Sequence, residues 1–489
     1  MFGIYGKRPS RETVALLRDT GASGILLLAR NIESPAQIRA LTHGLMDKLG
    51  RRLLFAIDHE GGWVLRFKSG VTAFPGNAAL GRTQDPALAY ATGRHMALEL
   101  APLGIGMNLA PVVDVVGAAY NPGIGIRSFG SDAAMVGRLG AAFVRGLQEH
   151  GVAACAKHFP GKGAATVDAH VALPTIRLPK AELLRTHLAP FQAAARAGVA
   201  SIMTSHVRMP AFDSKPASFS RAITTDLLRK RLGFRGAIIS DDLCMGAVTT
   251  RGPVPAAAWD AFQAGHDVVM VAHDLMAMRD SVDLFRAMAE SGVLPPAALE
   301  ASCRRIEALL RFPKAGRRGP APEAGARLAG QVARRAAQQV RAGGLALPLA
   351  RDKSRTLVLF PDFAQVRERF TFEGGPAGPL AFMRRALRGL GPARLELAPV
   401  ESGSAGRLLS AVRQADRVVF FCFEALRFPG QKAVLEMLNR AAPKRSAVCL
   451  IRSSHDLKLV APGVTAVDAY GYRLCQLEAA LELVFGARP

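Results

Sequence analysis

Asp168 and His170 have the spacing of a proton donor and the group that orients it. One residue, Ala169, separates them in a glycine-rich stretch, and extended residues two apart project to the same side of the chain. The carboxylate can then fix the tautomer of the imidazole and stabilise its charged form, which leaves a general acid near neutral pH. The alternative interpretation of this spacing is an Asx turn beside a surface histidine.

Five consecutive apolar runs each end in ionisable residues, a repetition that packing alone does not explain. Each residue also has a structural interpretation. Asp114 and Asp242 can cap the helices that follow them, and His206 can be a hydrogen-bonded core residue. The run ends are AIDHEGG with Asp58, PVVDV with Asp114, AKHFPGKG with Lys157 and His158, SHV with His206, and IISDDL with Asp241 and Asp242.

The elements that must position these residues repeat along the first 300 residues. Short β-branched or leucine-rich runs alternate with longer stretches of helical period, which is typical of βα units around a parallel sheet. Eight such runs predict a closed (β/α)8 barrel of the TIM type, in which chemistry collects at the carboxyl ends of the strands. The predicted strands are 2–5, 24–29, 53–58, 107–115, 152–158, 201–207, 237–242 and 267–272.

The rest of the chain predicts a smaller, open α/β/α domain. Residues 312–326 are rich in Pro, Gly and Arg and lack apolar periodicity, so we expect a linker there. The predicted organisation is therefore a catalytic barrel over 1–311, this linker, and an accessory domain over 327–489. The expected elements of the accessory domain are a basic helix near 327–341 and strands at 355–360, 417–423 and 446–451.

Composition excludes several classes of protein. Of the 489 residues, 49% are hydrophobic and 21% are charged, which does not fit disordered, collagen-like or coiled-coil chains. No apolar stretch reaches the ~18 residues of a membrane span, and the first residues lack the order of a secretory signal, so we expect a cytoplasmic protein. Six cysteines without CxxC or CxxH spacing indicate neither disulfides nor a zinc site.

The charge balance bears on possible partners. Lys and Arg number 63 against 39 Asp and Glu, a net charge of +24 that favours anionic partners. An arginine-rich composition shared by the whole proteome is the alternative explanation. Nucleic acid is not expected as a partner, because two Trp and five Tyr offer few stacking platforms and no recognition motif is present. The sequence makes no prediction of oligomeric state.

Five segments together resemble a known enzyme family. In order and spacing they are similar to the glycoside hydrolase family three β-N-acetylglucosaminidases, and the KHFPG(x)G(x)4D(x)H stretch is specific to the β-N-acetylhexosaminidase branch. The resemblance covers most of the first 245 residues, and parts of the second domain resemble the family's accessory α/β layer. The segments are AIDHEGGWVLRF, NPGIGIRSFG, AKHFPGKGAATVDAH, MTSHVRMPAFD with the following PASFS, and IISDDLCMGA.

This resemblance implies a retaining hydrolase that removes terminal β-linked N-acetylglucosamine and needs no metal or organic cofactor. It implies Asp241 as the nucleophile, His170 as the acid/base and Asp168 as its orienting partner. The nucleophile would attack the anomeric carbon while the histidine protonates the departing oxygen and later deprotonates water. Sugar ligands of the family fall on Asp58, Arg66, Arg127, Lys157 and His158, and His206 is a further candidate.

The sequence departs from the family at two positions. Members commonly have His in place of Lys162 and Arg in place of Trp63, so we expect an altered loop and wall near the sugar. A structural salt bridge is the alternative role of Arg66 and Arg127. The resemblance implies a carbohydrate substrate of the muropeptide-recycling type, an anionic N-acetylglucosaminyl glycoside, with chitin-derived disaccharides as the other class.

Three other functions stay as alternatives. A metal-dependent amidohydrolase barrel would use Lys157, His158, His206 and Asp241, but it predicts an HxH motif on the first strand, where the sequence reads FGIYG. A binding protein without turnover would be a sugar sensor or a polyanion binder. A glycoside phosphorylase would use phosphate in place of water.

Overall fold

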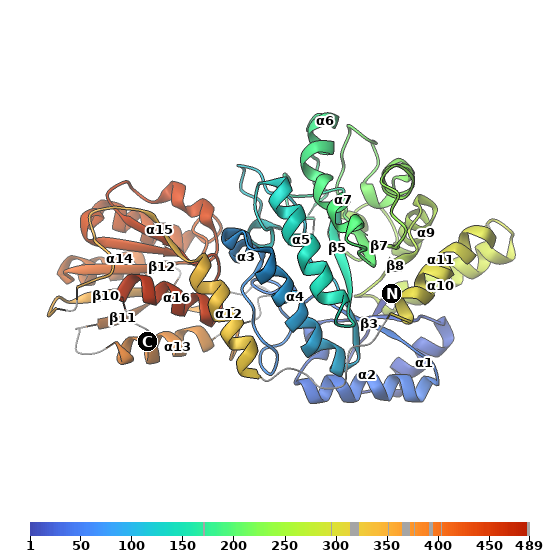
Figure 1. The fold of residues 1–489 in the computed structure, drawn as a ribbon, viewed down its shortest axis with the longest axis horizontal. Helices are drawn as coiled ribbons and strands as arrows, with labels where there is room; N and C mark the ends of the chain where they lie inside the picture. Colours follow the sequence, from blue (N-terminus) through green and yellow to red (C-terminus); the bar gives the residue numbers. More distant parts are fainter. Residues whose placement is uncertain are drawn as a thin grey trace. The chain divides into compact units, whose positions relative to one another are not determined.

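The chain divides into two compact α/β units, which we describe separately (Figure 1). The first comprises 1–60 and 84–321, and the second 61–83 and 322–489. The domain boundaries predicted from sequence stay a prediction, and residues 313–321 of the predicted linker lie outside the described residues. This computed structural model describes residues 1–169, 172–294, 296–312, 322–350, 352–363, 372–375, 377–390, 395–401 and 403–486.

The first unit is an eight-stranded parallel barrel. Its strands are hydrogen-bonded in chain order from β1 to β8, and a parallel bridge between Phe2 and Val271 joins the first strand to the chain just after the last. The predicted (β/α)8 fold class is thus confirmed. The strands are β1 (Phe2–Gly3), β2 (Gly24–Leu27), β3 (Leu54–Ile57), β4 (Ile105–Asn108), β5 (Ala153–Phe159), β6 (Ser201–Thr204), β7 (Ala237–Asp242) and β8 (Val268–Met270).

Strand β4 ends earlier than the sequence predicts. The predicted strand runs over 107–115, whereas β4 ends at Asn108, three residues before a proline that has no N–H to donate to a ladder. The Asn108 side chain accepts from the His59 N–H at 3.0 Å and donates to the His59 carbonyl oxygen at 2.9 Å. Asp114 therefore lies in the connection after the strand, which stays beside β5 through a hydrogen bond from the Val113 N–H to the Lys157 carbonyl oxygen (2.8 Å).

Side chains from successive strands form one buried apolar cluster. Lys157 follows Cys155 by two residues on β5 and therefore points to the same side, beyond this cluster and toward the carboxyl end of the barrel. The cluster includes residues of seven of these strands, from β2 to β8, among them Leu54, Met107, Cys155, Met203 and Ile239.

Helices cover the outside of the barrel, and Figure 1 shows α4, α5 and α7 side by side. Several begin after a side chain that accepts backbone hydrogen bonds, as Asp132 does from the N–H groups of Ala134 and Met135 at the start of α5. The helices of this unit are α1 (Arg11–Thr20), η1 (Ala29–Asn31), α2 (Pro35–Leu49), α4 (Pro86–Leu100), η2 (Ala101–Leu103), η3 (Gly125–Arg127), α5 (Ala133–Gln148), α6 (Lys180–Glu182), η4 (Leu183–His187), α7 (Ala189–Arg196), η5 (Ala217–Phe219), η6 (Ala222–Arg231), α8 (Gly246–Thr249), α9 (Val254–Ala264), α10 (Leu275–Glu290) and α11 (Pro296–Leu310). Within the described ranges, no helix is long and apolar enough to cross a membrane.

The second unit is a six-stranded sheet between two layers of helices, which confirms the predicted α/β/α class. Its strand order is β11-β10-β12-β13-β14-β9, with β9 antiparallel at one edge. One buried cluster on the sheet includes residues of α13 and α16, and a second cluster includes residues of α14 and α15. The elements are α3 (Asn77–Thr83), α12 (Pro322–Ala336), β9 (Gln338–Arg341), β10 (Thr356–Pro361), α13 (Gly378–Gly389), β11 (Leu395–Val400), α14 (Ala405–Gln414), β12 (Arg417–Cys422), α15 (Pro429–Ala441), η8 (Pro443–Arg445), β13 (Ser446–Leu450), η9 (Ser454–Leu459), β14 (Thr465–Asp468) and α16 (Leu474–Phe485).

Two details of the second unit differ from the sequence prediction. The basic helix expected near 327–341 ends at Ala336, because the residues that follow form β9 and pair with β14. Strand β11 was not predicted. It contains Pro399 and lies at an edge of the sheet, where a missing N–H is tolerated.

Asp267, directly before β8, is a buried polar hub of the barrel and yields a first prediction. Its carboxylate accepts from Arg229 at 2.7 Å, from Arg305 and Ser302 at 2.8 Å, and from the Ile238 N–H at 2.9 Å. We expect Asp267→Ala to lower the free energy of unfolding by about 3 kcal/mol, because it leaves two partly buried arginines, a buried hydroxyl and a buried backbone N–H without their shared acceptor.

The measurement is the urea midpoint followed by far-UV circular dichroism. The matched control is Asp226→Ala, which removes an exposed carboxylate that pairs with Lys230, and we expect it to leave the urea midpoint almost unchanged, because water screens this pair. Equal midpoints for the two variants would contradict the assignment of Asp267 as a hub.

Candidate active site

Two carboxylates and two cations alternate at the carboxyl ends of β3 and β5. The Lys157 ammonium lies 2.7 Å from Asp58 Oδ1 and 2.8 Å from Glu60 Oε1. Arg127 forms a forked pair with Glu60, its Nε at 2.9 Å from Oε2 and its Nη2 at 2.8 Å from Oε1. Asp58 directly follows β3 and Lys157 lies on β5, so the barrel itself brings this set together.

The charges of this set stabilise one another out of water. Burial alone would raise the pKa of Glu60, but Arg127 and Lys157 outweigh burial and hold that pKa below its ordinary value. Burial would likewise lower the pKa of Lys157, but Asp58 and Glu60 outweigh burial and raise it. Glu60 and Lys157 are therefore ionised at neutral pH, and with Asp58 and Arg127 they form a fixed array of donors and acceptors.

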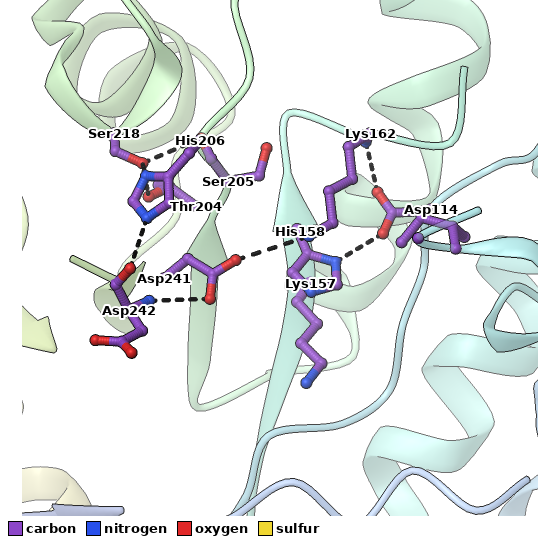
Figure 2. Close-up of polar contacts among 12 residues, drawn as sticks. Asp114, Lys157, His158, Lys162, Thr204, Ser205, His206, Ser218, Asp241 and Asp242 are labelled. Carbon is purple, nitrogen blue, oxygen red and sulfur yellow. Dashed lines mark hydrogen bonds and ion pairs between the residues drawn. The ribbon is translucent and has the colours of Figure 1, made fainter. Parts of the chain in front are cut away.

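Asp114 joins His158 to the loop that follows β5. Its Oδ2 lies 2.8 Å from His158 Nδ1, and its Oδ1 accepts from the Lys162 backbone N–H at 2.6 Å (Figure 2). Burial raises the pKa of Asp114 to about 6. The carboxylate orients the imidazole and holds the start of the loop, so its role differs from the helix cap weighed from sequence.

Asp241, near the end of β7, faces the side chain of Lys162 (Figure 2). Its Oδ2 lies 3.7 Å from Lys162 Nζ, and its Oδ1 accepts from the Asp242 N–H at 3.0 Å. The Asp241 side chain is 16% exposed. A partly exposed carboxylate at the end of a barrel strand, with both oxygens oriented, has the geometry of a nucleophile.

Asp242 has a different environment from Asp241. Its Oδ1 accepts from the backbone N–H groups of Cys244 at 3.2 Å and Ala272 at 3.0 Å, so it connects the turn after β7 to the chain after β8. Burial raises the pKa of Asp242 to about 6. These contacts stabilise the backbone at the barrel mouth.

His206 lies against Asp242 and is buried. Its Nε2 lies 3.1 Å from the Asp242 carbonyl oxygen, and its Nδ1 lies 2.8 Å from Ser218 Oγ. Its ring stacks on Phe219, with the centroids 6.2 Å apart. Both ring nitrogens contact protein groups, which matches the alternative interpretation of a hydrogen-bonded core histidine.

Asp168 lies in the loop after β5, near the groups described above. A Cβ added at Gly123 would lie 3.3 Å from Asp168 Cγ, so the carboxylate would have to shift by a few tenths of an ångström to admit a side chain there. The next residue, Ala169, is 3% exposed, packs against Met245 and accepts at its carbonyl oxygen from the Ala247 N–H at 3.2 Å. This end of the loop is thus attached to the turn after β7. His170 lies outside the described residues.

Arg66 and Trp63 belong to the segment 61–83, which packs with the second unit and is described with it. There the Arg452 guanidinium lies 3.8 Å from the centre of the Trp63 ring, and Arg473 Nε donates to the Gly62 carbonyl oxygen at 2.6 Å. The Trp63 departure is therefore accompanied by a cation–π contact inside the second unit.

Of the residues singled out from sequence, the barrel brings most to the carboxyl ends of its strands. Sequence reasoning missed Glu60, although its spacing of two from Asp58 in AIDHEGG was a usable signal. Lys162 was identified from sequence only as a departure from the family, and its position beside Asp241 was not predicted. Among the described residues, no three His, Cys, Asp or Glu side chains are grouped so that they could hold a metal ion. The residues that meet there are Asp58, Asp114, Arg127, Lys157, His158, Asp168, His206, Asp241 and Asp242.

Comparisons with known proteins agree with this geometry. The model of the glycosyl hydrolase family 3 N terminal domain matches residues 2–309. A β-hexosaminidase of Thiobacillus denitrificans is 38% identical over 277 residues, which are 55% of this chain and 77% of that protein.

Solved structures extend the likeness. A family 3 β-N-acetylglucosaminidase from Paenibacillus is 30% identical with a TM-score of 0.91, and the match covers 100% of this chain and 95% of that one. NagZ from Neisseria gonorrhoeae, solved with N-trifluoroacetyl-D-glucosamine, is 33% identical with a TM-score of 0.59, over 68% of this chain and 97% of that one.

The buried position of Glu60 yields a prediction on stability and pH. Its pKa in the folded protein lies below the ordinary value of 4.5, so the ionised carboxylate stabilises the fold above pH 4.5 and this contribution is lost as the pH falls through the folded pKa. We expect Glu60→Gln to lower the free energy of unfolding by about 3 kcal/mol at pH 7, because Arg127 and Lys157 lose a shared counter-charge.

Urea midpoints of wild type and variant, measured at pH 7 and at pH 4, test this expectation. The difference in midpoint between wild type and variant must be smaller at pH 4 than at pH 7. Glu33→Gln, which removes an exposed carboxylate that pairs with Lys7, is the control and should show almost no gap at either pH. A Glu60→Gln gap that stays constant or widens at pH 4 would mean that Glu60 is not ionised in the folded protein.

Proposed function

The chain belongs to glycosyl hydrolase family 3, and from that premise we propose that it is a retaining exo-β-N-acetylglucosaminidase that works through a covalent glycosyl-enzyme. Two observations support this proposal: Asp241 is oriented at the end of β7, and the loop that leads to His170 is attached to the turn directly after β7. The sequence relatives are β-hexosaminidases, and the neighbouring structures include β-N-acetylglucosaminidases.

Asp241 is the proposed nucleophile. In the first step one carboxylate oxygen bonds to the anomeric carbon, and the bond from that carbon to the leaving oxygen breaks. In the second step water attacks the same carbon and the ester to Asp241 breaks. Configuration inverts twice and is therefore retained.

His170 is the proposed acid/base, with Asp168 as the group that orients it. It donates a proton to the departing oxygen in the first step and takes one from water in the second. The hydrogen bond between Ala247 and Ala169 holds the loop one residue before His170 and six residues after Asp241, which supports a shared site. An imidazole has less repulsion with an anionic nucleophile than a second carboxylate would have.

The array around Lys157 is the proposed binding site for sugar hydroxyls. Asp58 supplies acceptors and Lys157 supplies donors, which suits a ligand whose hydroxyls do both. Arg127 orients this array through its forked pair with Glu60. The structural salt bridge that was the alternative role of Arg127 is therefore compatible with a role near the sugar. We assign His158 to the same function, as the resemblance implies, and the sugar-binding role of Arg66 stays a prediction of that resemblance.

The proposed natural substrate is an anionic N-acetylglucosaminyl fragment of peptidoglycan, cut in the cytoplasm. The net charge of +24 supports an anionic substrate. All six cysteines lie in the described part of the chain and are free thiols, three of them buried, which suits a reducing compartment.

Two substitutions test the proposed roles. Asp241→Asn should abolish turnover of an aryl β-N-acetylglucosaminide, because the amide cannot form the glycosyl ester. His170→Ala should slow a natural disaccharide by ~10² to 10⁴ and a dinitrophenyl glycoside far less, because the latter leaves without a proton. The measurement is kcat/KM on both substrates.

Equal losses on both substrates in His170→Ala would contradict the acid role. Binding of N-acetylglucosamine by the wild type without any turnover would favour the sugar-sensor alternative. Sugar-1-phosphate formed in phosphate buffer would favour the phosphorylase alternative, and activity abolished by a chelator and restored by zinc would favour the metal-dependent one.

A further inference from the structure

Lys162 is a buried cation that the proposed mechanism does not use. Its side chain is 8% exposed, and its ammonium lies 3.7 Å from Asp241 Oδ2. That separation is longer than a hydrogen bond and well inside the range of a strong charge interaction. The cation therefore acts on the carboxylate without occupying the oxygen as a close hydrogen-bond donor would.

The backbone that carries Lys162 is fixed on several sides. Its N–H donates to Asp114 Oδ1 at 2.6 Å, and the carbonyl oxygens of Lys162 and Gly163 accept from Asn121 Nδ2 at 2.9 and 3.0 Å. A Cβ at Gly163 would lie 1.9 Å from the Val115 carbonyl oxygen, so this close approach requires glycine. The backbone of Lys162 is therefore fixed, and burial of its side chain restricts where the ammonium can lie, as a group that acts through its charge requires.

The charges that face Lys162 come from three parts of the barrel: β7, the connection between β4 and α5, and the loop after β5. Burial lowers the pKa of Lys162, and Arg127 adds to this effect, while Asp241, Asp114 and Asp168 oppose it. Neutralising Asp241 therefore removes one of the carboxylates that hold the ammonium in this buried position.

We propose that Lys162 is a positioning residue for Asp241: its charge keeps the carboxylate ionised and favours its departure from the glycosyl-enzyme. This inference rests on the proposed function of Asp241. In the glycosyl-enzyme the Asp241 ester carries no charge, so the ammonium has lost that partner. Hydrolysis of the glycosyl-enzyme restores the ion pair between Lys162 and Asp241.

The second step balances without any further reactant. The water oxygen bonds to the anomeric carbon, its proton goes to the acid/base, and the bond between that carbon and Asp241 breaks with its electron pair on the carboxylate. The negative charge thus develops 3.7 Å from the Lys162 ammonium. Stabilising a charge that develops in the transition state accelerates the step.

Lys162→Met tests this inference, because it keeps the length of the side chain and removes its charge. On a dinitrophenyl N-acetylglucosaminide, whose first step is fast, we expect kcat to fall at least ~10-fold and KM to fall with it, because the glycosyl-enzyme accumulates. The acid limb of kcat/KM should move up by about 1 to 3 pH units, because Asp241 loses a neighbouring cation. Intact mass after an acid quench should show more glycosyl-enzyme than in wild type.

Lys162→Arg keeps the charge and should retain the wild-type acid limb. Lys162→His should retain kcat at low pH and lose it above about pH 6.5, where imidazole loses its proton, and it decides the question if Lys162→Met does not fold. Lys230→Met removes an exposed lysine that pairs with Asp226 and should leave every parameter unchanged.

Wild-type kcat, acid limb and glycosyl-enzyme level in Lys162→Met would overturn the inference and leave the proposed function intact. If the wild type forms no glycosyl-enzyme, the proposed function fails. The ion pair is then judged from the carboxyl 13C resonance of Asp241, whose titration midpoint must be higher in Lys162→Met than in wild type. Equal midpoints would overturn the inference in that case too.

Discussion

The structure of the barrel mouth depends on the requirement that charges removed from water be balanced by close opposite charges. Two carboxylates, Asp58 and Glu60, meet two cations, Lys157 and Arg127, at separations of 2.7 to 2.9 Å. Taking any one of them away leaves a buried charge without its partner, which is costly in a medium of low polarity. The partners come from different strands and loops. Their ion pairs therefore also hold the ends of these segments close to one another.

The same requirement organises the loop after β5. Asp114 holds its first residues through the Lys162 N–H, and Asn121 holds the next two carbonyl oxygens. Farther along, Ala169 is attached to the turn after β7. Buried polar contacts thus fix the loop at Lys162 and Gly163 and again at Ala169, and they bring the cation of Lys162 to Asp241. In this account the proposed chemistry depends on the electrostatics that stabilise the fold.

Much of the fold could be predicted from sequence, because eight apolar runs of the right length are a strong signal for a barrel. Polar residues at run ends likewise located Asp58, Lys157 and Asp241. Pairings that cross the chain were harder to predict. Glu60 was not singled out from sequence, because its partners Lys157 and Arg127 are distant in the chain. The contact between Lys162 and Asp241 also depends on a loop path that no local pattern specifies. Strand β9 was assigned to a helix, because pairing with β14 overrode its local propensity.

The central claim is that Asp241 carries the sugar between the two chemical steps. The most direct measurement is peptide mapping by mass spectrometry after reaction with a fluorinated N-acetylglucosaminyl donor, whose glycosyl-enzyme hydrolyses slowly. We expect one added sugar, located on Asp241. A sugar attached to another residue, or turnover with no covalent species and an inverted product, would contradict it.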